Sequence, residues 1–438
     1  MNLSKRNVRT ATALVVIVFM MCQLVQAQNS FVSVKDHQFI LNGKPYYYIG
    51  TNYWYGGLLA LLDDPKRGKK RLQKELDFLH KKGVNNLRVL AGVEGTGQVN
   101  GVKRVSPSLQ PQQGKFNDNL LAGLDYLLAE MGKRNMKAVI YLSNNWEWSG
   151  GFLQYLNWNG LLPDSIMRRK LTWDENRDIV QQFYNCGPCK AEYNNQLKLI
   201  VSRTNTISGK QYKDDAAIMA WELANEPRPM RAKAIPAFTK WIEDASSLVK
   251  SIDPNHLVTT GSEGEMGSEN METFEAAHAV KTIDYLTIHI WPKNWGWFTD
   301  TLIAAGFNRM LNNTSAYIDK HIEVAKRLKK PLVIEEFGLP RDNHSFVNKS
   351  STTLRDNYYR QMFTLWNESR LRSGIVAGCN FWGFGGIGRA AKNSHYVWSE
   401  GDDYTSDPPM EEQGLNSVFD NDKNTWKLIK TFTKLSTE

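Results

Sequence analysis

Short apolar runs recur along the chain, and each is followed by a longer stretch in which apolar residues return at helical spacing. Runs of four to eight apolar residues are typical of buried strands. The predicted strands are residues 46–51, 86–90, 137–142, 217–223, 257–260, 285–289, 332–336 and 375–382. The predicted helices include residues 71–82, 120–134, 237–252, 316–328 and 354–370.

Strands that alternate with helices predict a parallel sheet. Eight repeats in a chain of this length favour an α/β fold in which the sheet closes into a (β/α)₈ TIM barrel. The rival is an open doubly wound sheet, which has a Gly-rich phosphate-binding turn after its first strand. Here the first strand is followed by Asn-Tyr-Trp-Tyr at 52–55. Because no linker or internal repeat divides residues 28–438, we predict one catalytic domain.

The first 27 residues have the pattern of a secretory signal peptide. Three basic residues, Lys5, Arg6 and Arg9, precede an apolar stretch at 11–25, and Ala27 ends the segment. The apolar stretch is shorter than the roughly 20 residues of a membrane span. We therefore predict a secreted protein, extracellular or periplasmic, whose mature form has no membrane segment.

Charge and aromatic content narrow the class of partner. Removing residues 1–27 lowers the formal net charge from +9 to +6. The only dense basic tract, residues 66–71, is predicted to be a solvated helix face, so we expect no nucleic-acid partner. The chain contains 14 Trp and 17 Tyr. Those in polar loops would offer flat rings to the faces of sugars.

Two cysteines form a Cys-Gly-Pro-Cys sequence, Cys186 to Cys189, which is the spacing of a redox motif. Thioredoxin chemistry places the first cysteine at a helix N-terminus directly after a strand, but residues 173–184 are amphipathic and helix-like. A zinc site would need about four ligands. We predict a Cys186–Cys189 disulfide, permitted by an oxidising compartment, and a buried free thiol at Cys379. A thiol oxidoreductase remains an alternative.

Polar and aromatic residues follow the predicted strands, where a barrel carries its catalytic groups. They are Asn52, Trp54, Arg88, residues 144–148, Asn225, Glu226, His289, Trp291, Glu336 and Trp382. A retaining glycosidase needs two carboxyl groups about 5–5.5 Å apart. The fourth and seventh strands end near Glu226 and Glu336, which are the candidate pair.

The sequences around these glutamates resemble a known family. Residues 221–228, Trp-Glu-Leu-Ala-Asn-Glu-Pro-Arg, resemble the acid/base motif of glycoside hydrolase family 5, and residues 334–338, Ile-Glu-Glu-Phe-Gly, resemble its nucleophile motif. The resemblance narrows to the β-mannanases and runs from near residue 35 to near 430. It is carried by residues 50–54, 144–146, 203–206, 212–215, 407–409 and 413–414.

The resemblance implies a retaining endo-β-1,4-mannanase that hydrolyses mannan, glucomannan or galactomannan, with Glu226 as acid/base and Glu336 as nucleophile. Its partners would be β-mannan or manno-oligosaccharides, and we expect a monomer without a cofactor. Asn225 is implied to hold the sugar 2-hydroxyl, and Trp382 to stack beneath the cleaved sugar. Trp146, Trp54 and Trp295 are further candidates for the cleft.

Three assignments near the glutamates stay open. Arg88 is a candidate substrate-binding residue, and it either stabilises the Glu336 anion or forms a structural ion pair with Glu222. Because neighbours on a strand face opposite sides, Glu335 and Glu336 are not both expected at the mouth, and the family motif selects Glu336. His289 is implied by the resemblance to lie near the nucleophile and the cleaved sugar, and the alternative is a core histidine.

Position 291 departs from the family pattern. Trp291 stands where family members commonly carry a tyrosine, which puts the hydrogen bond from that hydroxyl to the nucleophile in question.

Two further functions remain possible on this fold. The chain could be another β-glycanase, such as a cellulase or an exo-β-mannosidase, because substrate choice depends on the loops. It could also be a carbohydrate-binding protein without catalysis. The acidic residues at 402–412 match no calcium loop, so we expect a solvated turn and no metal.

Overall fold

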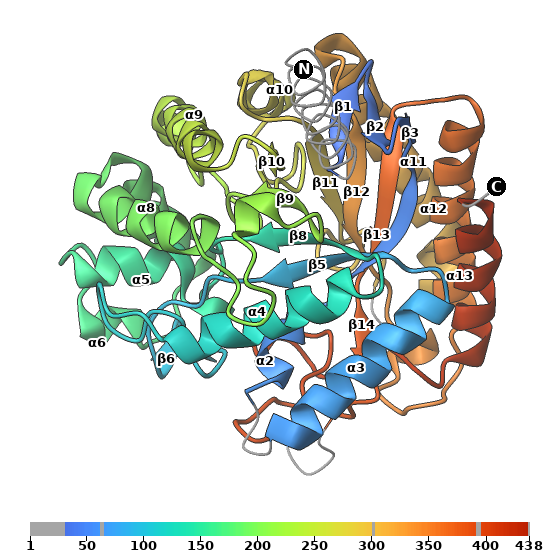
Figure 1. Cartoon of the computed structure of the whole chain (residues 1–438), viewed down its shortest axis with the longest axis horizontal. Coiled ribbons are helices and arrows are strands. Elements are labelled where there is room, and N and C mark those ends of the chain that lie inside the picture. The colour runs from blue at the N-terminus through green and yellow to red at the C-terminus, as the bar shows by residue number, and fades with distance from the viewer. Residues whose placement is uncertain (1–30, 62–64, 300–302, 391–395, 437–438) are drawn as a thin grey trace, which may run out of the picture.

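The computed structural model describes residues 31–61, 65–299, 303–390 and 396–436. In this part of the chain, one sheet of eight parallel strands forms the centre of the molecule (Figure 1). In chain order the strands are β4 (Tyr48–Asn52), β5 (Asn86–Leu90), β8 (Lys137–Tyr141), β9 (Ile218–Glu222), β10 (Leu257–Thr259), β11 (Leu286–Ile290), β12 (Leu332–Phe337) and β13 (Val376–Phe381). All eight lie within two residues of their predicted positions.

Successive strands along the chain are neighbours in the sheet, and β13 pairs with β4. The ends of the sheet, β10 and β11, approach each other through a hydrogen bond from the Asp284 N–H to the Val258 carbonyl, 2.8 Å. The sheet is therefore a nearly closed barrel in a single domain, which confirms the predicted fold class.

Helices surround the barrel (Figure 1). The long ones are α3 (Pro65–Lys81), α4 (Asp118–Gly132), α8 (Gly187–Val201), α9 (Ile235–Ile252), α11 (Ile303–Leu328), α12 (Thr353–Leu371) and α13 (Lys423–Leu435). The shorter ones are α2 (Gly56–Leu59), α5 (Gly151–Trp158), α6 (Asp164–Met167), α7 (Trp173–Val180) and α10 (Met271–Ala279). The five predicted helices are confirmed, although α11 begins well before the predicted residue 316.

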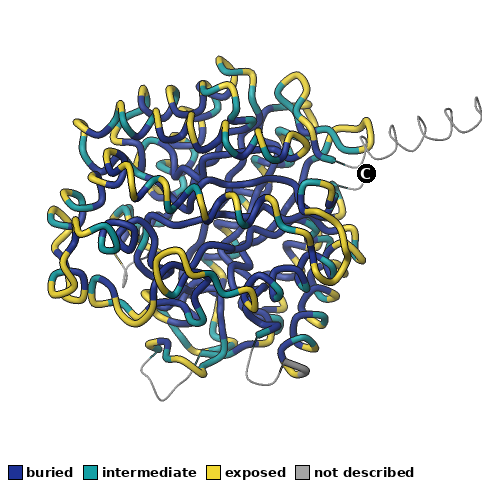
Figure 2. Tube along the Cα trace, turned by 60° about the vertical axis from the view of Figure 1, so that its left-hand side comes forward, coloured by how far each residue is buried: buried dark blue, intermediate teal, exposed yellow. Residues whose placement is uncertain are grey.

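The apolar stripe of α3 illustrates how these helices pack. Leu72, Leu76 and Leu79 recur at intervals of four and three residues, and all three are fully buried. Arg71 corrects the prediction of a solvated basic face, because it is buried and donates to Glu75 Oε1, 2.9 Å away. Figure 2 shows the same division over the whole molecule, with the buried trace at the centre and the exposed trace in outer helices and loops.

Cys186 and Cys189 form a disulfide at the start of α8, as predicted. The helix before it, α7, begins with a capping box in which Thr172 and Glu175 each accept a hydrogen bond from the other's backbone N–H. No strand precedes Cys186 directly, which removes the structural context that thioredoxin chemistry requires. Cys379 is a buried free cysteine, as expected.

The two ends of the barrel are covered differently. A hairpin sheet of β1 (Ser33–Lys35), β2 (Gln38–Leu41) and β3 (Lys44–Pro45) lies at the end where the strands begin, and the nearby Tyr47 hydroxyl donates to the Gly374 carbonyl, 2.7 Å. Two small ribbons, β6 (Gln98–Val99) with β7 (Val102–Lys103) and β14 (Phe384–Gly386) with β15 (Val418–Phe419), belong to the loops that follow strands. No helix in the described ranges is long and apolar enough to span a membrane. The predicted signal peptide lies outside the described residues.

Candidate active site

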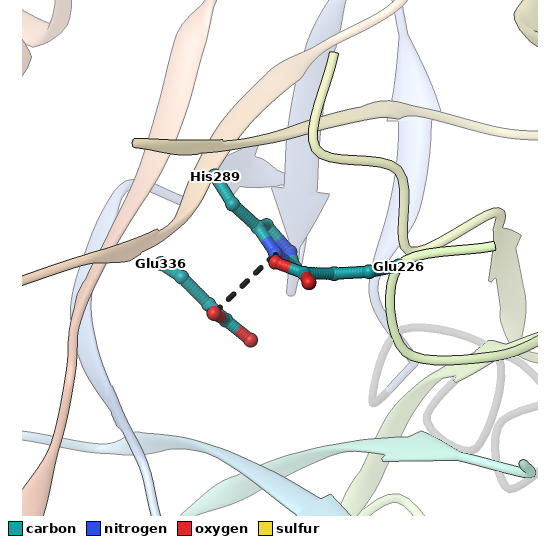
Figure 3. Close-up of side chains that lie close together, drawn as sticks. All are labelled: Glu226, His289 and Glu336. Carbon is teal, nitrogen blue, oxygen red and sulfur yellow. Dashed lines mark hydrogen bonds and ion pairs between the residues drawn. The ribbon is translucent and has the colours of Figure 1, made fainter. Parts of the chain in front are cut away.

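Glu226 and Glu336 meet at the end of the barrel where the strands finish (Figure 3). Glu336 lies within β12, and Glu226 follows β9. Carboxylate oxygens of the two glutamates and a ring nitrogen of His289 all lie within 4.8 Å of one another. Glu226 adopts a left-handed backbone conformation, with φ of 51°. That conformation is uncommon for a residue with a Cβ, and such strain is concentrated at functional sites.

Arg88 on β5 contacts Glu336 and two residues beside it. Its Nη1 donates to Glu336 Oε1, while Nε and Nη2 donate to Glu222 at 2.8 and 2.5 Å. It also donates to the Asn225 side-chain oxygen, 2.7 Å. Arg88 therefore makes both of the contacts that were considered, the one with Glu336 and the ion pair with Glu222. Arg88 is fully buried and does not line the pocket, which corrects its assignment as a substrate-binding residue.

The side chains of Glu335 and Glu336 both approach this cluster, contrary to the alternation expected of a strand. The pairing of β11 with β12 passes from Ile288–Ile334 directly to His289–Glu336, so Glu335 has no partner across the pair. This β-bulge turns a side chain that would otherwise face away. Glu335 Oε2 lies 3.4 Å from His289 Nε2 and 3.6 Å from Arg88 Nε.

His289 and Trp291 of the β11 region contact the catalytic pair directly. His289 Nδ1 lies 2.6 Å from Glu226 Oε1 and 3.4 Å from Glu336 Oε2. The Trp291 indole N–H donates to Glu336 Oε2 at 3.0 Å. The Trp291 indole N–H therefore supplies the hydrogen bond to Glu336 that the absence of a tyrosine hydroxyl had put in question. His289 is fully buried behind the glutamates, so it contacts them rather than lining the pocket.

Burial raises the proton affinity of both Glu226 and Glu336. Burial raises the pKa of Glu226. Burial also raises the pKa of Glu336, with the charge of Glu226 adding to the effect and Arg88 opposing it. Two such close carboxylates hold one proton between them. Arg88 donates to Glu336 and not to Glu226, so we place the proton on Glu226. This assignment suits an acid at Glu226, which must hold a proton, and a nucleophile at Glu336, which must be ionised.

The glutamates line a pocket of about 500 Å³. The candidate residues that line it together include Asn225, Glu226, Glu336, Trp146, Trp291, Trp295 and Trp382. The Trp146 indole N–H donates to Glu226 Oε2, and Asn225 donates to the Asn144 side-chain oxygen at 3.1 Å. Trp54 does not line the pocket. It is 1% exposed and its indole N–H donates to the Ser406 carbonyl, which corrects its predicted place in the cleft.

One wall of the pocket contains residues that the sequence reading missed. Arg228 forms a paired ion contact with Glu263 at 2.5 and 2.8 Å. Its guanidinium lies 4.9 Å from the centre of the Trp146 ring and 5.7 Å from that of Trp173. Trp173 is 48% exposed and begins α7, whose next five residues are all polar. A tryptophan beside a run of polar residues was the feature of the sequence that could have indicated this part of the wall.

A loop between β14 and β15 forms another wall with Pro408, Met410 and Glu411. Asp407 fixes this loop, because its carboxylate accepts from the Gly414 N–H and from the Ser417 hydroxyl at 2.9 and 2.6 Å. Asp407 is 1% exposed, which corrects the predicted solvated turn at this residue, whereas Glu412 is exposed. Burial and the neighbouring Asp407 raise the pKa of Glu411 to about 8.

Glu226, His289 and Glu336 are also the one group of three potential metal ligands among the described residues. Their oxygen and nitrogen atoms already contact one another, Arg88, Trp146 and Trp291. Two such carboxyl groups complete the chemistry of glycoside cleavage without a metal or cofactor. A barrel with two carboxyl groups meeting at the ends of its fourth and seventh strands has the architecture of a glycoside hydrolase.

Comparison with known proteins places the chain more narrowly. A family model described as GH family 5 beta-mannosidase-like matches residues 29–437, and the chain belongs to this family of glycoside hydrolases. Mannan endo-1,4-beta-mannosidase 1 of Arabidopsis thaliana is 30% identical over 374 residues, covering 82% of each chain.

Two solved structures are also similar. The glycoside hydrolase family 5 mannosidase of Rhizomucor miehei has a TM-score of 0.83 and 32% identity, covering 94% of this chain and 98% of that one. The endo-beta-1,4-mannanase of Thermotoga petrophila has a TM-score of 0.65 and 25% identity, covering 90% and 78%.

Proposed function

We propose that this enzyme cleaves β-1,4-mannosidic bonds within mannan, glucomannan or galactomannan and retains the anomeric configuration. The observation that carries the proposal is the approach of Glu226 and Glu336, because one carboxylate oxygen of each lies within 4.8 Å of the other. Retaining glycosidases place their carboxyl groups about 5–5.5 Å apart, whereas inverting ones leave roughly 6.5–9.5 Å for a water.

The reaction has two steps on this pair. In the first, Glu336 attacks the anomeric carbon while Glu226 protonates the departing glycosidic oxygen. In the second, Glu226 removes a proton from water, and the water displaces Glu336. Arg88 and the Trp291 N–H stabilise the Glu336 carboxylate before attack and after its release.

Two hydrogen bonds fix the side chain of Asn225 beside the pocket, where it can contact the substrate. Its side-chain oxygen accepts from Arg88, and its amide donates to Asn144 Oδ1. Asn225 lines the pocket beside Glu226, in a position suited to the sugar 2-hydroxyl, whose hydrogen bonds strengthen in the transition state. The mannan substrate is supported by the names of the relatives in Arabidopsis and Thermotoga.

The test is an NMR time course of anomeric signals during hydrolysis of mannohexaose. The β-anomer should appear first and then equilibrate, whereas an initial α-anomer would overturn the retaining mechanism.

Glu226→Gln and Glu336→Gln should abolish release of reducing sugar, with exposed Glu412→Gln as the matched control. Equal turnover of cellulose and mannan would overturn the substrate assignment. Undiminished activity in both active-site variants would overturn the assigned pair.

A second candidate is an exo-acting β-mannosidase, favoured by one wall of the pocket. Pro408, Met410 and Glu411 face the catalytic pair from the loop between β14 and β15. Such a wall would limit the number of sugars that bind on its side. The Rhizomucor relative of this shape is named a mannosidase. Early products from mannohexaose decide: mixed oligomers support the endo mode, and mannose with mannopentaose supports the exo mode.

We also propose that the enzyme is secreted and acts as a monomer. The basic and apolar pattern of residues 1–27 supports export. Mass spectrometry of the exported protein should find an N-terminus at Gln28, and an intact Met1 would contradict cleavage.

Light scattering coupled to gel filtration should give the mass of one chain, whereas twice that mass would contradict the monomer.

A further inference from the structure

Two carboxyl groups that the reaction does not use lie directly behind the catalytic pair. Glu222 and Glu335 are both fully buried, and Glu226 and Glu336 are 7% and 2% exposed. Three of these carboxyl groups, those of Glu222, Glu335 and Glu336, contact the one guanidinium of Arg88, and that of Glu226 lies beside Glu336. Uncompensated buried charge is costly, so this cluster must keep some of its carboxyl groups protonated.

The hydrogen bonds indicate which groups are ionised. Arg88 donates twice to Glu222 and once to Glu336, as it would to carboxylates. The donors near Glu335 are distant, His289 Nε2 at 3.4 Å and Arg88 Nε at 3.6 Å, and its Oε1 has no donor among the described residues. The Glu335 carboxyl group also forms a side-chain hydrogen bond with Glu222, which requires a proton on one of the two. A buried carboxylate without donors is unfavourable, whereas a carboxylic acid in the same place is not. Glu335 is therefore the second protonated group, beside Glu226.

The other groups around Glu335 favour the same state. Burial raises its pKa, and the charge of Glu222 raises it further against the opposing effects of Arg88 and His289. The phenols of Tyr48 and Tyr285 also face this region, and burial raises the pKa of both, so they remain neutral. No cation other than Arg88 contacts Glu335 in the described part of the chain.

His289 connects the two protonated carboxyl groups. Nδ1 lies 2.6 Å from Glu226 Oε1, and Nε2 lies 3.4 Å from Glu335 Oε2. Burial lowers the pKa of His289 to about 4, so the ring is neutral at neutral pH and carries one N–H. If Glu335 donates its proton to Nε2, the N–H must be on Nδ1, where it donates to Glu226 Oε1.

We propose that protonated Glu335 is a positioning residue that fixes the tautomer of His289 and thereby keeps an N–H donor on the acid/base Glu226. This inference rests on the proposed role of Glu226. The donor on Oε1 leaves Oε2, beside Trp146, to give up and accept the proton of the reaction. It also stabilises the Glu226 carboxylate that must act as base in the second step. Ionisation of Glu335 would draw the N–H to Nε2 and present a lone pair to Glu226.

Two substitutions separate this role from simple packing. Glu335→Gln keeps a donor for Nε2 but cannot ionise, whereas Glu335→Met keeps the volume and removes the donor. We expect Glu335→Gln to retain kcat within about threefold and to move the alkaline limb of its pH profile upward. Glu335→Met should lose at least about tenfold in kcat while its melting temperature shows that it is folded.

A direct readout is the ¹⁵N spectrum of His289 in histidine-labelled protein. At the pH optimum, wild type and Glu335→Gln should show a protonated Nδ1 and an unprotonated Nε2. In wild type the assignment should invert at high pH, and in Glu335→Gln it should not. Glu263→Gln removes another buried carboxylate of the pocket that pairs with Arg228, and it should leave the tautomer unchanged.

A protonated Nε2 in wild type at the pH optimum would overturn the proposal. Equal loss of kcat in the Gln and Met variants, with an unchanged tautomer in the Met variant, would do the same. If the proposed substrate is wrong, wild type would fail to cleave mannan while the tautomer readout still gave its answer. The two failures are therefore distinguishable.

Discussion

The Trp291 indole N–H donates a hydrogen bond of 3.0 Å to Glu336, the proposed nucleophile. A donor to the ionised form of a carboxyl group lowers its pKa. Trp291 thus assists Arg88 in keeping the nucleophile ionised within a pocket whose other features favour protonation.

Replacing Trp291 by Phe should therefore raise the pKa of Glu336. Hydrogen bonds to charged groups contribute about 1.5–3 kcal/mol, and one pKa unit corresponds to about 1.4 kcal/mol. We expect the acidic limb of kcat/KM to move up by about one pH unit, because the nucleophile must be ionised. Trp382→Phe is the control, since the Trp382 indole nitrogen has no hydrogen-bond partner among the described residues. The same shift in both variants would contradict the role of the Trp291 N–H.

Arg88→Lys should impair catalysis and stability together. A lysine ammonium cannot reproduce the fork with which Arg88 contacts Glu222, Glu336 and Asn225. We expect kcat to fall by about 10²–10³-fold and the free energy of unfolding to fall by roughly 3–5 kcal/mol. Calorimetry and steady-state kinetics measure the two effects.

The matched control for Arg88 is Arg341→Lys. Arg341 is also fully buried and paired, with Asp422 at 2.7 and 2.9 Å, but it lies outside the pocket. The Arg341→Lys variant should have a lower free energy of unfolding and an unchanged kcat. A similar loss of kcat in both variants would mean that Arg88 acts through general stability alone.

Glu411 should make stability depend on pH. Its pKa is about 8 in the folded protein against an ordinary value of 4.5. A group with a raised folded pKa favours folding fully below pH 4.5, and that contribution is lost as pH rises towards 8. Glu411→Gln cannot ionise, so its melting temperature should exceed that of wild type increasingly from pH 5 to 8. The exposed Glu412→Gln should show no such trend, and parallel curves for Glu411→Gln and wild type would refute the prediction.

Removing the disulfide should have a small effect. Cys186 and Cys189 close a loop of only four residues, for which the chain-entropy model gives at most about 2 kcal/mol of stabilisation. The double Cys→Ser variant should therefore fold, lose a few degrees in melting temperature and keep its kcat on mannohexaose. Loss of activity in that variant, or reduction of insulin by wild type, would revive the redox interpretation.

The positions of the eight strands could be read from the sequence because each buried strand is a short continuous apolar run between amphipathic helices. The candidate glutamates could be selected because their motifs coincide with the ends of the fourth and seventh runs. Local side-chain chemistry decides these features, so a single sequence carries them. The Cys186–Cys189 disulfide follows in the same way from close spacing along the chain.

Contacts between distant segments decided the rest. Glu335 faces Arg88 and His289 because a bulge interrupts β12, and no residue pattern marks that bulge. Trp54 is buried against a loop some 350 positions later, where its indole N–H donates to Ser406. The wall around Glu411 depends on the buried Asp407. The sequence alone determined which residues end the strands, and only the tertiary structure decided which way those side chains point, because orientation depends on register and on partners remote in the chain.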